Sequence, residues 1–335
     1  MLYWELSLTF LLSLLLVAGV RQFAPAWGLI DTPNDRSIHR SQTPRGAGLG
    51  FFVAVALVIL LFHFHYILMH AGVFLAIFVV VVAGLLDDLH DISFRVKFAI
   101  LILGAILLSF CDIRVDDLGN FFGMHVVLGW LAIPFTVFAV VGFTNALNLI
   151  DGIDGLSASI SIVILSGFWY VGVQHHDALL TMLSMAFVSA LLAFLVFNWR
   201  PASIFMGDSG SLLLGFVIAI LAIRSLAYLP PVHVLFMIAL PVLDTLVVMV
   251  RRRRRGYPIF HADQCHMHHI LKRFFAYSTP RTVIFLTILQ SIYTFTGLHL
   301  DRSIDSGILL ILFALNALLI YFGLNGMIAR QEKGC

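Results

Sequence analysis

The 335 residues are 61% hydrophobic and only 11% charged, with a formal net charge of +2 and a mean hydropathy of +1.01. This composition lies far outside the range of soluble domains, so lipid is the expected solvent for most of the chain. Backbone groups in lipid must be hydrogen-bonded within their own segment, and the apolar runs are continuous rather than alternating. Both facts favour α-helices and argue against a β-barrel.

Apolar runs long enough to cross a bilayer recur along the whole sequence. A bilayer core of about 30 Å requires about 20 apolar residues per helix. The first run lacks the basic start and the cleavage site of a signal peptide, so we expect it to be retained. We therefore predict an all-α polytopic membrane protein that forms a single domain, 1–335, with about eleven transmembrane helices at residues 3–20, 47–63, 71–86, 97–111, 129–146, 156–173, 179–197, 210–228, 232–250, 282–298 and 306–325.

The distribution of basic residues predicts the orientation. If the eleven spans alternate, all but three of the 20 Lys and Arg residues fall in the loops on one side, the exceptions being Arg114, Arg224 and Arg302. The positive-inside rule makes that side cytoplasmic. We therefore expect a periplasmic N-terminus, a cytoplasmic C-terminus and an active site formed by the cytoplasmic loops, because the same loops carry the acidic and histidine motifs described next.

The first motif is a pair of adjacent carboxylates, Asp87 and Asp88, at the inner end of the third span, with Lys97 further along. Two neighbouring carboxylates repel each other unless a cation or a proton binds between them. A solvated helix end is the alternative interpretation, but the position between two apolar spans favours a functional site.

The second motif closes the fifth span and combines Asn145, Asn148 and Asp151 with Asp154. In a helix the first three residues recur every third position and share one face. Oxygen ligands with this spacing suit a hard cation such as Mg²⁺. A polar helix cap is the alternative interpretation.

The third motif lies between the seventh and eighth spans and contains Asn198, Phe205 and Asp208. Gly207-Asp208-Ser209-Gly210 can begin a helix, and the same geometry offers free N–H groups to a phosphate and a carboxylate to its metal ion. The ring of Phe205 could stack on a nucleobase. The motif is weak alone and informative beside the other two.

The fourth motif is a histidine cluster in the last large cytoplasmic loop. It comprises His261, Asp263, Cys265, His266, His268 and His269. Contact with phosphate oxygens, a zinc site and an ordinary surface loop all remain open, although no second Cys completes a usual structural zinc set.

Two further features precede this loop. The run Arg251–Arg255 is interpreted as a topology anchor at anionic headgroups, with direct substrate binding as the alternative. Asp244 lies inside the ninth predicted span, where a carboxylate is either functional or part of a buried pair.

Taken together, the motifs resemble those of the polyprenyl-phosphate N-acetylhexosamine-1-phosphate transferase superfamily, and most closely its WecA-like members. The resemblance covers nearly the whole chain. It includes the four motifs in order on one side of the membrane, and an early segment with Pro33, Asn34, Arg36 and His39 followed by Pro44-Arg45-Gly46, whose role stays open.

The resemblance implies a role for each matching residue. It places catalysis at Asp87, Asp88 and Asp151, and a metal ion, Mg²⁺ with Mn²⁺ as a possible substitute, at Asn148 and Asp208. It further implies that the substrates contact seven other residues, namely Lys97, Asp154, Asn198, Phe205, His266, His268 and His269.

The implied reaction is transfer of a sugar 1-phosphate from a UDP-sugar to undecaprenyl phosphate in the bacterial inner membrane. The histidine motif favours UDP-GlcNAc, and another UDP-N-acetylhexosamine, including a 6-deoxy sugar, is the alternative. Direct attack by the lipid phosphate is favoured over an enzyme-linked intermediate. An ion-coupled transporter is the remote alternative, because its ionisable residues would lie near the midplane of the membrane. We expect lipid but no nucleic acid as a partner, and leave monomer or homodimer open.

Overall fold

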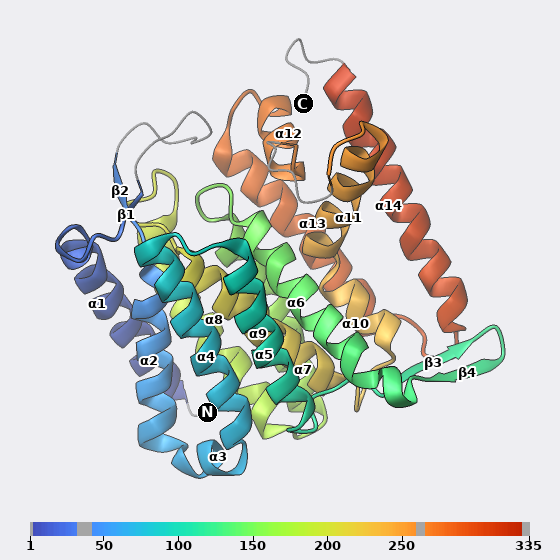
Figure 1. Ribbon diagram of the computed structural model, residues 1–335, viewed down its shortest axis with the longest axis horizontal. Coiled ribbons are helices and arrows are strands. Elements are labelled where there is room, and N and C mark those ends of the chain that lie inside the picture. Colours follow the sequence, from blue (N-terminus) through green and yellow to red (C-terminus); the bar gives the residue numbers. More distant parts are fainter. Residues whose placement is uncertain (1–2, 32–41, 259–264, 330–335) are drawn as a thin grey trace.

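The computed structural model describes residues 3–31, 42–258 and 265–329, and a helix occupies every segment in which the sequence predicts a span (Figure 1). Two apolar helices, α2 (Ala47–Phe62) and α5 (Phe94–Ser109), have 16 residues each. The long helices are α1 (Tyr3–Trp27), α4 (Ala71–His90), α6 (Ala132–Ile150), α7 (Leu156–Gln174), α8 (Ala178–Asn198), α9 (Asp208–Ser225), α13 (Thr279–His299) and α14 (Ser306–Ala329).

The multi-pass helical architecture is confirmed, but the number of crossings is not. By length and composition, eight helices of the described part can cross a membrane, and the bent pair α10 (Pro231–Met237) and α11 (Ala239–Arg254) would add a ninth. A helix of 16 residues is only about 24 Å long, which is short for a bilayer core of about 30 Å. The total of about eleven crossings therefore stays a prediction.

The predicted span at 232–250 is broken, because α10 and α11 meet at an angle of 86°. A break inside a membrane frees backbone groups that lipid cannot satisfy. The fully buried Gln290 of α13 replaces the missing bonds: its Oε1 accepts from the Leu240 N–H at 3.1 Å, and its Nε2 donates to the Met237 carbonyl at 2.7 Å. The sequence analysis predicted one continuous span because both halves are apolar, although Pro241 near the start of α11 is a signal for a break.

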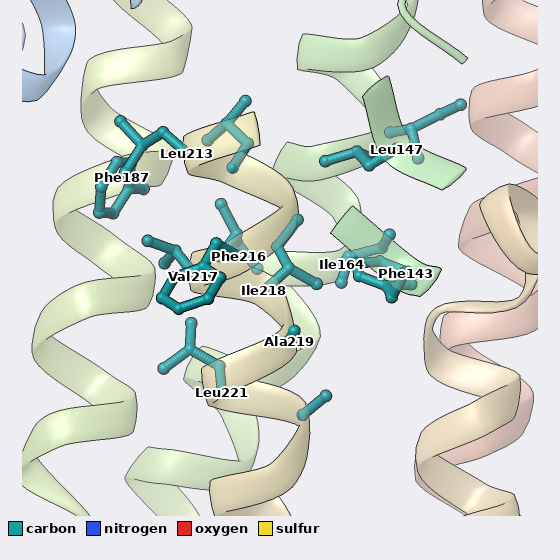
Figure 2. Packing of buried hydrophobic residues seen from close by; sticks show 14 of the residues in the cluster. Phe143, Leu147, Ile164, Phe187, Leu213, Phe216, Val217, Ile218, Ala219 and Leu221 are labelled. Atoms are coloured by element: carbon teal, nitrogen blue, oxygen red, sulfur yellow. The ribbon is translucent and has the colours of Figure 1, made fainter. Parts of the chain in front are cut away.

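Helix α9 lies at the centre of the bundle and contacts α2, α4, α6, α7 and α8. Its apolar side chains are buried all round, as expected of a helix surrounded by other helices. Figure 2 shows Leu213 and Phe216 of α9 between Phe187 of α8 on one side and Phe143 and Leu147 of α6 on the other. The N-terminus of this central helix is consequently fixed by its neighbours.

The elements outside the long helices are short, and the sequence analysis did not predict them. Strands β1 (Ile30–Asp31) and β2 (Thr43–Pro44) pair antiparallel, as do β3 (Asp117–Phe121) and β4 (Met124–Val127). Helices α3 (Phe64–Met69) and α12 (Met267–Phe274) and the 3₁₀ helix η1 (Gly129–Leu131) are also short. In Figure 1, β1, β2 and α12 lie at one end of the bundle, whereas α3 and the β3–β4 hairpin lie at the other.

Glycines allow α2 and α4 to approach the first turn of α9. A Cβ on Gly84 of α4 would lie 2.6 Å from the Ser209 Cα, and a Cβ on Gly48 of α2 would collide with the backbone of Gly210. Backbone atoms cannot rotate away as a flexible side chain can. These two glycines therefore let the start of α9 sit directly against the ends of its neighbours.

We expect Gly84→Ala to destabilise the protein by about 1–3 kcal/mol, the usual cost of overpacking a core. The matched control is Gly142→Ala on α6, where an added Cβ meets nothing within 4 Å. That change should be neutral or slightly stabilising, because Ala is the better helix former. Thermal unfolding of both variants in detergent measures the difference, and equal midpoints would contradict the close contact.

Candidate functional site

At the end of the bundle that carries β1, β2 and α12, the chain encloses a cavity of about 390 Å³. The cavity is bounded by residues from the ends of long helices and from the loops that follow them. Eight predicted site residues line it: Asp88, Asn148, Asp151, Asp154, Asn198, Phe205, Asp208 and His269. The structure thus brings together side chains from motifs up to about 180 positions apart in the sequence, as expected of a functional pocket in a helix bundle.

Asp208, at the first position of α9, is the centre of a polar network at the cavity. Lys97 of α5 forms ion pairs with both Asp208 and Asp87, the latter at 2.7 Å from Nζ to Oδ2. The Nδ2 of Asn148 donates to Asp208 Oδ1 at 3.0 Å and to Ser211 Oγ at 2.8 Å. Asp87 and Lys97 therefore belong to the site through these ion pairs, although neither residue lines the cavity.

Asp88 holds the beginning of α9 in place. Its two carboxylate oxygens accept from the N–H groups of Asp208, at 2.8 Å, and Ser209, at 3.0 Å. These are groups that a helix N-terminus otherwise leaves unpaired. Gly207 precedes them with φ +74°, and a Cβ there would lie 2.5 Å from a carboxylate oxygen of Asp88. The geometry gives Asp88 a positioning role for Asp208.

Asp151 differs from the other acids because its carboxylate has no hydrogen-bond or ion-pair partner among the described residues. Burial raises the pKa of Asp151 to about 7, and repulsion from Asp208, Asp88 and Asp154 adds to the shift. Each of these groups lines the same cavity. A cation bound near Asp151 would reduce this repulsion between carboxylates.

The far end of the cavity contains Asp154, Asn198 and Phe205. Asp154 pairs with Arg200 at 3.1 Å and accepts from the Ala202 N–H at 3.2 Å. The amide of Asn198 accepts from the Gly155 N–H at 2.9 Å and donates to the Ile204 carbonyl at 3.0 Å. Asn198 thus braces two loops of the wall, while the ring of Phe205 faces the cavity.

The histidine motif is held by α11. His266 Nδ1 lies 2.7 Å from Asp244 Oδ2, and the Met267 N–H donates to Asp244 Oδ1 at 2.6 Å. Two turns further along α11, Arg251 donates to the Cys265 carbonyl at 2.5 Å. Asp244, whose partner the sequence could not identify, is therefore part of a buried pair that fixes the start of α12.

His268 and His269 follow on α12, and of these two histidines only His269 lines the cavity. The buried His268 packs against Gly152, where any side chain would collide with its imidazole ring, and its ring centroid lies 4.1 Å from that of His269. Burial, with repulsion from His266, lowers the pKa of His269 to about 4, and burial also lowers the pKa of His268. Both histidines are consequently neutral near pH 7 and can exchange hydrogen bonds but supply no counter-charge.

The side chains around Asp208 fit a hard divalent cation. The surrounding donors are oxygen atoms, from Asp208, Asp151, Asn148 and Ser211, and the unpartnered, partly protonated Asp151 marks a position where a cation would relieve repulsion. Among the described residues, no three His, Cys, Asp or Glu side chains form a ready-made metal site. A cation there would draw on the amide oxygen of Asn148 and on ligand oxygens, which is how Mg²⁺ is often held.

The structure adds cationic residues that the sequence analysis did not assign to the site. Arg45, Arg200 and Lys272 all line the cavity. Lys272 could have been predicted from the sequence. It follows His268 by four positions and His269 by three on α12, so the three side chains share one face of the helix. Arg45 belongs to the early segment and Arg200 to the third motif, but the sequence does not show whether their side chains point into the cavity.

The interpretation of the arginine run needs a correction. Arg251 and Arg252 are buried, so neither is an exposed contact for lipid headgroups, and Arg251 also links α11 to α14 by donating to Asn325 at 3.2 Å. Arg253 to Arg255 are exposed, as the interpretation expected. Residues 32–39 of the early motif, together with His261 and Asp263, lie outside the described residues.

Comparison with known proteins gives consistent results. The family profile described as glycosyl transferase family 4 matches residues 70–226. The chain is 32% identical to a probable undecaprenyl-phosphate N-acetylglucosaminyl 1-phosphate transferase of Bacillus subtilis, over 93% of this chain and 87% of that protein. It is 31% identical to an undecaprenyl-phosphate α-N-acetylglucosaminyl 1-phosphate transferase of Yersinia pestis, over 95% and 89%, and 29% identical to that of Escherichia coli K12, over 93% and 88%.

The pKa of His269 predicts a pH dependence of stability. A histidine whose pKa falls from 6.5 to about 4 on folding contributes stability fully above pH 6.5 and loses it as the pH falls toward 4, because the unfolded chain takes up the proton first. We expect His269→Gln to flatten the loss of thermal stability between pH 7 and pH 5. The exposed His65→Gln is the control and should leave the slope unchanged; an unchanged slope in His269→Gln would contradict the shift.

Proposed function

Because the chain belongs to the family of undecaprenyl-phosphate N-acetylglucosaminyl 1-phosphate transferases, we propose that it transfers a sugar 1-phosphate from a UDP-sugar to undecaprenyl phosphate. The products are undecaprenyl-diphosphate-sugar and UMP. The observation that carries this proposal is the convergence of Asn148, Asp151 and Asp208 on one cavity, where Lys97 pairs with Asp208. A cavity with acidic and cationic side chains suits the meeting of two phosphate-bearing substrates.

The chemistry explains why both kinds of charge are needed. An oxygen of the lipid phosphate attacks the phosphorus that bears the sugar, the bond from that phosphorus to the UMP oxygen breaks, and UMP leaves with the electron pair. Two anions must approach for this to occur, so positive groups have to offset their repulsion and hold the attacking oxygen in line. Lys97, Arg200 and Lys272 can supply that charge, whereas the neutral His268 and His269 can orient phosphate oxygens by hydrogen bonds.

A divalent ion completes the proposal. Mg²⁺, or Mn²⁺ in its place, would be held by Asp208 and Asn148, with Asp151 nearby, and would neutralise charge on the phosphates. In the same proposal Asp88 acts on Asp208 indirectly, through the backbone of α9. Asp87 is already paired with Lys97 at 2.7 Å, which supports direct attack by the lipid phosphate over a covalent intermediate on Asp87.

The donor is proposed to be UDP-GlcNAc, with other UDP-N-acetylhexosamines, including 6-deoxy sugars, as the second candidates. The curated relatives act on N-acetylglucosaminyl 1-phosphate according to their names. The wall formed by Asp154 and Phe205, with Arg200, suits a nucleotide, since it offers a ring for stacking and groups for hydrogen bonds. A panel of UDP-sugars assayed for lipid-linked product distinguishes the candidates.

The proposed location is the bacterial inner membrane, with the cavity facing the cytoplasm and the product entering O-antigen or other envelope polysaccharide synthesis. Support comes from the basic loops: Arg45, Arg200, Arg251 and Lys272 belong to the same end of the bundle as the cavity, and that end would face the cytoplasm by the positive-inside rule. A nucleotide donor reaches this side from water while the lipid tail stays in the bilayer.

The proposed function is tested by UMP release from purified protein. Turnover should require a UDP-sugar, polyprenyl phosphate and a divalent cation together, because the reaction joins the two substrates at one site. UMP release without polyprenyl phosphate, or undiminished release in the presence of EDTA, would overturn the proposal in its present form.

Asp208→Asn should lower the divalent-cation-dependent turnover by roughly 100-fold or more, the usual cost of removing a group that stabilises developing charge at an active site. A neutral amide is a far poorer ligand for a hard cation than a carboxylate. The control is Asp116→Asn, an exposed carboxylate paired with Arg114, which should keep normal turnover. Near-normal activity of Asp208→Asn at ordinary Mg²⁺ concentration would remove Asp208 from the metal site.

A further inference from the structure

Cationic side chains at the cavity contact two different acidic residues. Arg200 pairs with Asp154, and Lys272 also lines the cavity, whereas Arg45 donates to the backbone carbonyl of Asp88. Asp208 is linked to Asp88 through its backbone N–H and to Asn148 through its side chain. A reaction between two anionic substrates would use one of these cationic groups for each.

The backbone around Arg45 is braced so that the side chain has a defined position. The Arg45 N–H donates to the Leu29 carbonyl at 2.9 Å, which continues the β1–β2 pairing. The Phe205 N–H donates to the Pro44 carbonyl at 2.8 Å, and the Ala47 N–H donates to the Phe205 carbonyl at 3.1 Å. Arg45 is thus fixed to the same loop that carries Phe205 into the cavity.

The guanidinium of Arg45 has more N–H donors than the described residues use. Its Nη2 donates to the Asp88 carbonyl at 2.7 Å and lies 3.3 Å from a carboxylate oxygen of Asp91, which is itself 83% exposed. Its Nε is buried and has no hydrogen-bond partner among the described residues. A guanidinium has five N–H donors, and a buried donor without a partner is costly. Because Arg45 lines the cavity, its remaining Nη1 donors can bind an anionic or acceptor group there.

The surroundings of Arg45 indicate which anion belongs there. The ends of α4 and α5 beside Asp88 and Lys97 expose large apolar side chains: Leu86 is 40% exposed, Leu89 39% and Phe94 67%. Apolar side chains at a helix end that also carries ionisable groups suit a ligand with a hydrocarbon tail and a charged head. The ion pair of Asp154 and Arg200, by contrast, has the polar character of a nucleotide site.

We propose that Arg45 binds the terminal phosphate of the polyprenyl acceptor and so sets the position of the attacking oxygen, an assignment that rests on the proposed function. The Nη1 donors of Arg45, which no described residue uses, can give charge-assisted hydrogen bonds to an oxygen of this phosphate. Another oxygen of the phosphate is then free to point toward the sugar-bearing phosphorus of the donor. Arg45 forms no covalent bond, and the bonds made and broken in the transfer reaction are those given under the proposed function.

The test separates the Michaelis constants of the two substrates in the full-length protein. Arg45→Gln should raise the KM for polyprenyl phosphate roughly 10- to 100-fold, the equivalent of losing one or two charge-assisted hydrogen bonds, while the KM for the UDP-sugar changes little. Arg45→Lys should fall between, because it keeps the charge and loses the paired donors. Arg200→Gln should show the opposite pattern, with the larger effect on the UDP-sugar.

A structural role for Arg45 at the end of α4 is tested by Asp91→Asn. This change removes the ion pair but keeps the guanidinium, so the acceptor KM should stay within about threefold of the original, a difference worth well under 1 kcal/mol. If Asp91→Asn raises that KM as much as Arg45→Gln does, the ion pair rather than phosphate binding explains the effect. If Arg45→Gln fails to fold, Arg45→Lys tests the assignment instead, by whether the KM for polyprenyl phosphate rises more than the KM for the UDP-sugar.

The outcomes also separate this inference from the proposed function. Wild-type protein that releases no UMP from any UDP-sugar in the presence of polyprenyl phosphate would refute the proposed function itself. Wild-type protein that is active, with an Arg45→Gln variant that raises the donor KM or lowers kcat alone, would refute only the assignment of Arg45. An acceptor-specific rise in KM supports both.

Discussion

The site depends on one interaction, the pair of hydrogen bonds that the Asp88 carboxylate accepts from the first two N–H groups of α9. Helix α9 is the central helix, and its first residue is Asp208. A carboxylate at a helix N-terminus satisfies unpaired donors and complements the helix dipole. Because Asp88 comes from α4, this bond fixes the end of one apolar helix against the start of another, and with it the distance from Asp208 to Asp87 and Lys97.

Much of this arrangement could be predicted from the sequence, because its causes are local. Apolar runs locate the helices, and the motifs at their ends locate the cavity, so eight predicted site residues do line one space. The break between α10 and α11 was not predicted, although Pro241 follows Ile238 by three positions and has no N–H to donate to the Met237 carbonyl. The compensating Gln290 is remote in the sequence and could not be identified from it. The pair of Asp244 and His266 was hidden for the same reason.

The charge of the histidine motif could not be predicted from the sequence either. A loop with four histidines suggests positive charge, but burial lowers the pKa of His269 to about 4 and keeps it neutral. Burial cannot be read from spacing in a short loop helix. The positive charge at the cavity comes instead from lysine and arginine side chains, whose charge survives partial burial far better than that of an imidazole.

Two of the parts of the chain that form the site meet at Gly152. The helices from α4 to α9, which include most of the segment matched by the family profile, supply the carboxylates. The histidines belong to α12, which Asp244 and Arg251 of α11 hold in place, and Arg251 in turn binds Asn325 of α14. The absence of a side chain at Gly152 allows His268 to pack directly against the loop that carries Asp151. The C-terminal helices therefore do more than cross the membrane: through α12 they set how closely the neutral histidines approach the acidic centre.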